Sequence, residues 1–189
     1  MDVYEYLEAH KDEILREVLE FASIPSISTD ANYKAEVARA ARWVAAQLTE
    51  AGPLEPQVIE TKGHPVVYAE WLGAPGKPTV LVYGYYDVQP PDPLGKWLSP
   101  PFSPTIRDER IYARGVSDDK APLLTTIKVA QAFFASEVVY RSMSSFFSRV
   151  KKRWEVRISK VLSVNTPNSS GRISLSPLTA RCGGPIHPP

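Results

Sequence analysis

The chain has 189 residues, with 22 Lys plus Arg, 21 Asp plus Glu and a formal net charge of +1. It contains no uninterrupted apolar run near the ~18 residues that cross a bilayer, so we predict no transmembrane segment. The acidic start at residues 1–5 lacks the apolar core of a secretory signal, and the single Cys182 excludes an internal disulfide framework. These features favour a cytoplasmic protein.

The first third of the chain predicts two amphipathic helices. Apolar residues recur on one face of residues 3–23, and Pro25 ends that helix. Residues 28–30 offer N-cap oxygens for a second helix over residues 33–51, which stops at Gly52 and Pro53.

Strands and a third helix follow. Three segments separated by Gly and Pro turns predict strands, namely 58–60, 66–71 and 79–83. Residues 111–115 predict a short strand and turn, and residues 120–136 predict a helix. This order of elements suits an α/β layer fold.

The charge balance changes near residue 136. Residues 1–136 hold 13 basic and 19 acidic side chains, whereas residues 137–189 hold nine basic and two acidic ones. We therefore predict two parts: an α/β domain over 1–136 and an unrelated, basic, Ser-rich, irregular tail over 137–189.

Within the tail, apolar spacings of three and four predict a basic amphipathic helix over 138–162, and residues after 163 are expected to be disordered. Such a helix could bind a membrane surface or an acidic partner. Alternatively it packs on the incomplete sheet or is accidental, and alternation at Trp154, Val156 and Ile158 also allows a strand. No nucleic-acid motif accompanies it, so no nucleic-acid partner is expected.

Two acidic positions stand where an α/β fold collects ligands. The apolar run at 80–83 leads into Gly-Tyr-Tyr-Asp, so Asp87 is delivered at the carboxyl end of a buried strand. Asp118 lies at a predicted strand-to-helix junction and could reach the same crevice. Taken singly, each has a structural explanation, because Asp118 could cap the following helix and Asp87 could organise a turn.

The ordered phrases at 86–91 (Tyr-Asp-Val-Gln-Pro-Pro) and 115–120 (Gly-Val-Ser-Asp-Asp-Lys) resemble the carnosinase-like dipeptidases. These belong to the two-zinc peptidase family that also holds acetylornithine deacetylase and succinyl-diaminopimelate desuccinylase. The resemblance covers about residues 1–136 and implies a zinc-exopeptidase-type layered fold, with a mixed sheet flanked by helices. It places Tyr85 at the position of a His metal ligand, Asp87 at that of the catalytic Asp that holds its imidazole, and Asp118 at that of the acid bridging two zinc ions.

The chain departs from the family pattern in two ways. Tyr85 replaces the His, and a phenol binds metal only after losing a proton whose free pKa is about 10. The family's next strand should end in a Glu-Glu pair that supplies the general base and a ligand, and a further acid, a late His and an inserted lid domain should follow. After Ser136 the only acids are Glu137 and Glu155, and the only His is His187. We therefore expect an incomplete fold without the lid, and zinc that is absent or weakly bound.

The functional expectation is a fragment of a zinc-dependent dipeptidase or amidohydrolase that is inactive as this chain. If active, its substrate would be a small peptide or an acylated amino acid. A frameshift product, a non-enzymatic remnant with a selected basic tail, and a fragment complemented by a separate carboxyl-terminal polypeptide remain open alternatives.

Overall fold

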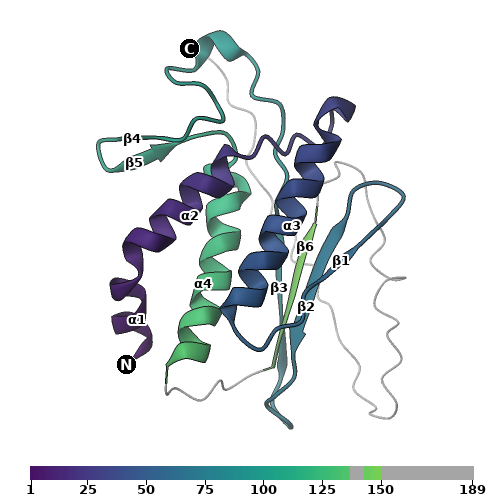
Figure 1. The fold of residues 1–189 in the computed structure, drawn as a ribbon, viewed down its shortest axis with the longest axis vertical. Helices are drawn as coiled ribbons and strands as arrows, with labels where there is room; N and C mark the ends of the chain where they lie inside the picture. The colour runs from purple at the N-terminus through teal and green to yellow at the C-terminus, as the bar shows by residue number, and fades with distance from the viewer. Residues whose placement is uncertain (137–142, 150–189) are drawn as a thin grey trace, which may run out of the picture. The chain divides into compact units, whose positions relative to one another are not determined.

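The computed structural model describes residues 1–136 and the backbone of residues 143–149 (Figure 1). The predicted disorder after residue 163 lies outside the described residues. Among the helices that are described, none is both long and apolar enough to cross a membrane.

The first predicted helix is two helices, α1 (Val3–Ala9) and α2 (Lys11–Ser23). Asp2 and Glu5 form a reciprocal capping box that starts α1. The chain bends at His10, whose φ of −107° and ψ of 9° lie outside the helical range. α2 ends before Pro25, as predicted.

The second predicted helix is α3 (Lys34–Ala51), preceded by a 3-10 turn at Ala31–Tyr33. The Asp30 side chain accepts a hydrogen bond from the main-chain nitrogen of Asn32 at 2.9 Å and so caps this turn. α3 stops at Gly52, and its buried positions include Val37, Val44 and Leu48.

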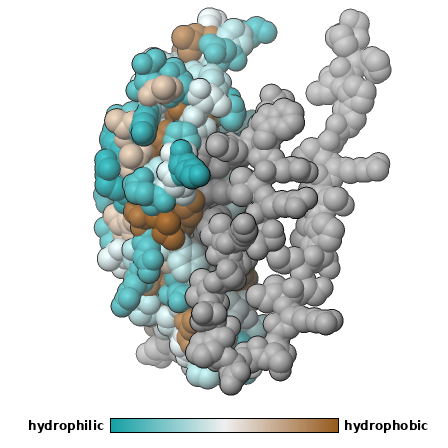
Figure 2. Space-filling model, turned by 90° about the vertical axis from the view of Figure 1, so that its right-hand side faces the viewer, coloured by the Kyte–Doolittle hydropathy of each residue, from teal (hydrophilic) through white to brown (hydrophobic). Residues whose placement is uncertain are grey.

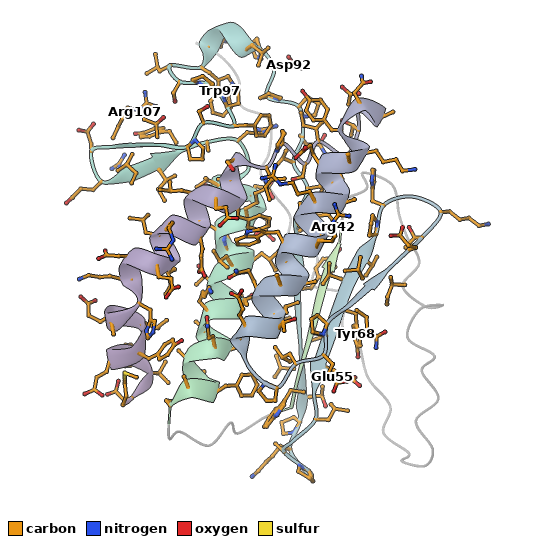
Figure 3. The ribbon with its side chains drawn as sticks, viewed as in Figure 1. Arg42, Glu55, Tyr68, Asp92, Trp97 and Arg107 are labelled. Carbon is orange, nitrogen blue, oxygen red and sulfur yellow. The ribbon has the colours of Figure 1, made fainter. Side chains whose placement is uncertain are left out.

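A four-stranded mixed sheet forms the second layer, in the order β1 (Gln57–Ile59), β2 (Val66–Trp71), β6 (Met143–Arg149), β3 (Thr79–Tyr85). β6 is parallel to β3 and antiparallel to β2, and β1 is antiparallel to β2. After β3 the chain forms a small hairpin, β4 (Thr105–Arg107) and β5 (Arg110–Tyr112), and then the crossover helix α4 (Ala121–Ala135). Figure 3 marks the loop before this hairpin by Asp92 and Trp97, and the hairpin itself by Arg107.

The core lies between the sheet and helices α3 and α4. Val67 and Ala69 of β2 are fully buried beneath these helices, and Trp71 meets Phe134 of α4 edge to face at 5.5 Å. Helices α1 and α2 pack against α4. Seen from the β1 side, the described surface is mainly hydrophilic with several separate apolar patches (Figure 2).

The predicted helix over 138–162 is wrong at Met143–Arg149, which form strand β6; the rest of that range lies outside the described residues. Ser144, Ser145 and Ser148 are poor helix formers, and hydrogen bonding to β2 on one side and β3 on the other outweighs the helical spacing of the apolar residues. A strand therefore does follow α4, and the sheet does not end at Ser136. That strand contains no acidic residue.

Candidate functional site

The carboxyl end of β3 delivers Tyr85, Tyr86 and Asp87 to the edge where α/β sheets bind ligands. The Tyr85 ring lies beside that of Tyr83, with centroids 5.1 Å apart. Tyr86 is fully buried and donates its hydroxyl to the main-chain oxygen of Pro65 at 2.5 Å. Burial raises the pKa of Tyr86 well above its ordinary value, with a smaller contribution from Asp87, so this phenol stays neutral.

Asp87 is a buried carboxylate held by a residue 59 positions earlier. Its side chain is 3% exposed, and the Ser28 hydroxyl donates to its Oδ2 at 2.5 Å. Ile27 and Val88 form a parallel β-bridge that aligns the two segments. The sequence suggested Ser28 only as a helix cap, because nothing local indicates a partner so distant in the chain. Structurally, Ser28 is a residue of the site.

His64 also reaches this segment. Its Nε2 lies 2.8 Å from the main-chain oxygen of Ser28, and the residue is half-buried. His64 is therefore not a freely solvated side chain of the turn. The imidazole anchors the turn between β1 and β2 to the segment that holds Asp87.

The second acidic segment is the irregular turn Val116–Lys120. The peptide bond between Asp118 and Asp119 is cis, and Asp118 has non-helical φ and ψ of −135° and 89°. Asp118 is exposed, whereas Asp119 is half-buried and its Oδ2 accepts a hydrogen bond from the main-chain nitrogen of Tyr85 at 3.0 Å. Asp119 is thus the side chain that joins this turn to the end of β3.

Two glycines permit this close packing. A Cβ on Gly84 would lie 3.2 Å from Asp119 Oδ2 and 2.9 Å from Leu123 Cδ1. A Cβ on Gly115 would lie 2.2 Å from Val88 Cγ1, and Gly115 also has a φ of +81°, which favours glycine. A side chain at either position would force the neighbouring side chains to shift.

The buried side chain of Lys120 anchors the start of α4. Its side chain is 1% exposed, and Nζ donates to the main-chain oxygens of Phe21 at 2.8 Å and Ile24 at 2.5 Å. Burial lowers the pKa of Lys120 to about 7, and the charge of Asp87 opposes the shift. This amine therefore ties the acidic turn to the end of α2.

The three predicted site residues stand in different surroundings. Tyr85 is bonded through its main chain, Asp87 is buried with Ser28, and Asp118 is exposed. Within the part of the chain that the structure describes, no group of three or more His, Cys, Asp or Glu side chains is placed to hold a metal ion. A protein zinc site needs three or four such donors. The described residues therefore do not fit the two zinc ions that the resemblance implies.

The geometry of the sheet and its edge defines the class of protein. A mixed sheet with a parallel strand pair, a crossover helix and acidic side chains at the carboxyl edge is a layered α/β domain with its candidate site in the place typical of enzymes.

Comparison with known proteins agrees with this class. Residues 81–143 match the model of Peptidase family M20/M25/M40. Cys-Gly metallodipeptidase DUG1 of Saccharomyces cerevisiae is 32% identical over 71% of this chain and 31% of the relative, and human Beta-Ala-His dipeptidase is 33% identical over 71% and 29%. The solved structure of the yeast di-peptidase Dug1p superposes with a TM-score of 0.71 at 28% identity, over 78% of this chain and 34% of that one.

The amino-terminal part of the chain is therefore similar to Peptidase family M20/M25/M40 and to metallodipeptidases. The chain spans about a third of the length of these relatives.

Proposed function

We propose that this chain carries the amino-terminal part of a metallodipeptidase domain and does not itself hydrolyse peptides. Two named relatives act on small dipeptides, Cys-Gly and Beta-Ala-His, so a complete domain of this type would cleave the peptide bond of a dipeptide. The observation that supports descent from such an enzyme is the junction of Asp119 with the main chain of Tyr85, which brings two family segments to one sheet edge. The single cysteine fits a cytoplasmic protein.

Donor chemistry supports the proposed inactivity. Asp87 already accepts a hydrogen bond from Ser28, and Tyr85 presents a phenol where the family pattern has an imidazole. Beyond residue 136 the sequence offers only Glu137, Glu155, Cys182 and His187 as further common zinc ligands. We infer that this set does not complete two metal shells, and we assign no catalytic step to a metal here.

The test is metal analysis and peptide hydrolysis with the purified full chain. We expect no stoichiometric zinc and no cleavage of Cys-Gly or Beta-Ala-His dipeptides. The Tyr85→His variant should still lack turnover, and Tyr83→His, two residues earlier on the same strand face, is the matched control. Two zinc ions per chain together with turnover by the unchanged chain would overturn the proposed inactivity.

A second candidate is activity by complementation, which an exposed face of the sheet favours. Leu81 and Tyr83 of β3 are 49% and 40% exposed, and Ile59 of β1 is 42% exposed. Helices α3 and α4 cover the opposite face, and no described helix covers this one. Parallel strands are usually covered on both faces. We propose that a separately encoded carboxyl-terminal polypeptide of the same family could bind here, and its co-expression should then yield a co-purifying, zinc-loaded dipeptidase.

A further inference from the structure

Asp119 joins two segments of the candidate site by bonding to the main chain. Its Oδ2 accepts a hydrogen bond at 3.0 Å from the main-chain nitrogen of Tyr85, which lies 34 positions earlier in the sequence. Because the donor belongs to the main chain, the bond does not depend on which side chain stands at position 85. Asp119 can therefore hold this position in the same place for a tyrosine or for the histidine of the family pattern.

Gly84 allows the Asp119 carboxylate to reach the end of β3. A Cβ at Gly84 would lie 3.2 Å from Asp119 Oδ2 and 2.9 Å from Cδ1 of Leu123, a residue of α4. The carboxylate thus packs directly against the main chain of the strand. Asp119 is also half-buried, and a hydrogen bond with a charged acceptor is stronger where water is partly excluded.

The residue after Asp119 is anchored in another direction. Lys120 Nζ donates to the main-chain oxygens of Phe21 at 2.8 Å and Ile24 at 2.5 Å. The main-chain nitrogen of Lys120 donates to the oxygen of Gly115 at 3.0 Å. Asp119 therefore ties the acidic turn to β3, while Lys120 ties it to the end of α2. Anchors on two consecutive residues leave the turn little freedom to shift.

Asp118 immediately precedes these two anchors and is exposed to solvent. It stands where the resemblance places an acid that bridges two metal ions. A side chain that binds a ligand must be held in position by its surroundings. A hydrogen bond made by the adjacent residue fixes the main chain without using the carboxylate that would bind.

We propose that Asp119 is a positioning residue of the candidate site, which holds residue 85 and the exposed Asp118 in a fixed relation without any metal ion. This role rests on the proposed descent from a metallodipeptidase domain, because that descent gives positions 85 and 118 their significance. The second acid of the Asp-Asp pair then acts on the geometry of the site and not as a metal ligand.

The test is amide hydrogen exchange and NMR spectroscopy of the full chain in the presence of a chelator. Asp119→Ala removes the acceptor and should speed exchange of the Tyr85 amide by about tenfold or more, the effect of losing about 1.4 kcal/mol. Nuclear Overhauser contacts between that amide and the turn Val116–Lys120 should also disappear from the folded variant. Asp119→Asn keeps an acceptor oxygen and should restore most of the protection. Asp12→Ala, at an exposed acid in the first turn of α2, is the matched control and should leave the Tyr85 amide unchanged.

The positioning role and the proposed inactivity fail on different results. Stoichiometric zinc and turnover in the unchanged chain would overturn the inactivity and leave the exchange result at Tyr85 intact. An unprotected Tyr85 amide in the unchanged chain with chelator would overturn the positioning role, and so would full protection in a folded Asp119→Ala protein. If Asp119→Ala does not fold, the Asp119→Asn protein decides, because complete loss of protection there would show that an acceptor oxygen is not enough.

Discussion

The Ser28 hydroxyl lies 2.5 Å from Asp87 Oδ2 and joins the segment after α2 to the segment after β3. Because Asp87 is only 3% exposed, water cannot readily replace this donor. Ser28→Ala should lower the free energy of unfolding by about 1.5 to 3 kcal/mol, the range for a hydrogen bond to a charged group. Urea denaturation measures the change, and Ser23→Ala is the control because that exposed hydroxyl bonds only to the main-chain oxygen of Glu20. Equal effects of the two substitutions would contradict a holding role for Ser28.

Glu17 and Lys128 form an ion pair across α2 and α4. Nζ lies 2.8 Å from the Glu17 carboxylate, with side-chain exposures of 5% for Lys128 and 11% for Glu17. Lys128→Met should cost about 3 to 5 kcal/mol because it leaves a buried carboxylate unpaired, whereas the double change Glu17→Leu with Lys128→Met should cost much less. A double-mutant cycle measured by chemical denaturation tests this expectation. If the losses of unfolding free energy in the two single variants simply add up in the double variant, the two charges do not stabilise each other.

Comparing Gly115 with Gly76 distinguishes two costs of adding a side chain: backbone strain at positive φ and steric overlap with a neighbour. Both have positive φ, +81° and +77°, but a Cβ would meet Val88 Cγ1 at 2.2 Å only at Gly115 and would meet nothing within 4 Å at Gly76. Gly76→Ala should cost about 1 to 2 kcal/mol for the left-handed backbone. Gly115→Ala should cost clearly more, by thermal and urea unfolding, because the valine must move as well. Equal losses would mean that the turn adjusts freely.

Lys120 predicts a pH dependence of stability. Burial lowers its pKa to about 7 in the folded chain, Asp87 and Glu36 oppose the shift, and Arg39 adds to it. Between pH 7 and about 10.5 the unfolded chain therefore binds more protons at this residue, so the free energy of unfolding should rise with pH in that window. Denaturation in the presence of a chelator should show this slope, and Lys120→Met should reduce it. An unchanged slope in a folded variant would assign the dependence to other groups.

Local patterns predicted most of the elements before β6. Amphipathic spacing indicated α3, and Gly52 and Pro25 indicated where helices end. β4 was not predicted, because three residues give too little alternation. β6 was predicted as a helix, since its neighbours on both sides come from β2 and β3 and leave no signal in the local sequence.

The candidate site divides in the same way. Family phrases pointed to Asp87 and Asp118, and their roles in this chain remain predictions. The structure was needed to identify three further residues of the site, Ser28, His64 and Asp119. Each of them bonds to a partner more than 30 residues away in the sequence. Such contacts depend on how β3 and the acidic turn meet in three dimensions.

The position of β6 has a consequence for synthesis on the ribosome. β2 and β3 follow one another in the sequence, yet each borders β6 rather than the other. As translation proceeds from the amino terminus, these two strands emerge long before residue 143 and must wait for their shared neighbour. During that interval their facing edges are open to other nascent chains, so the yield of soluble protein should depend on chaperones that shield them.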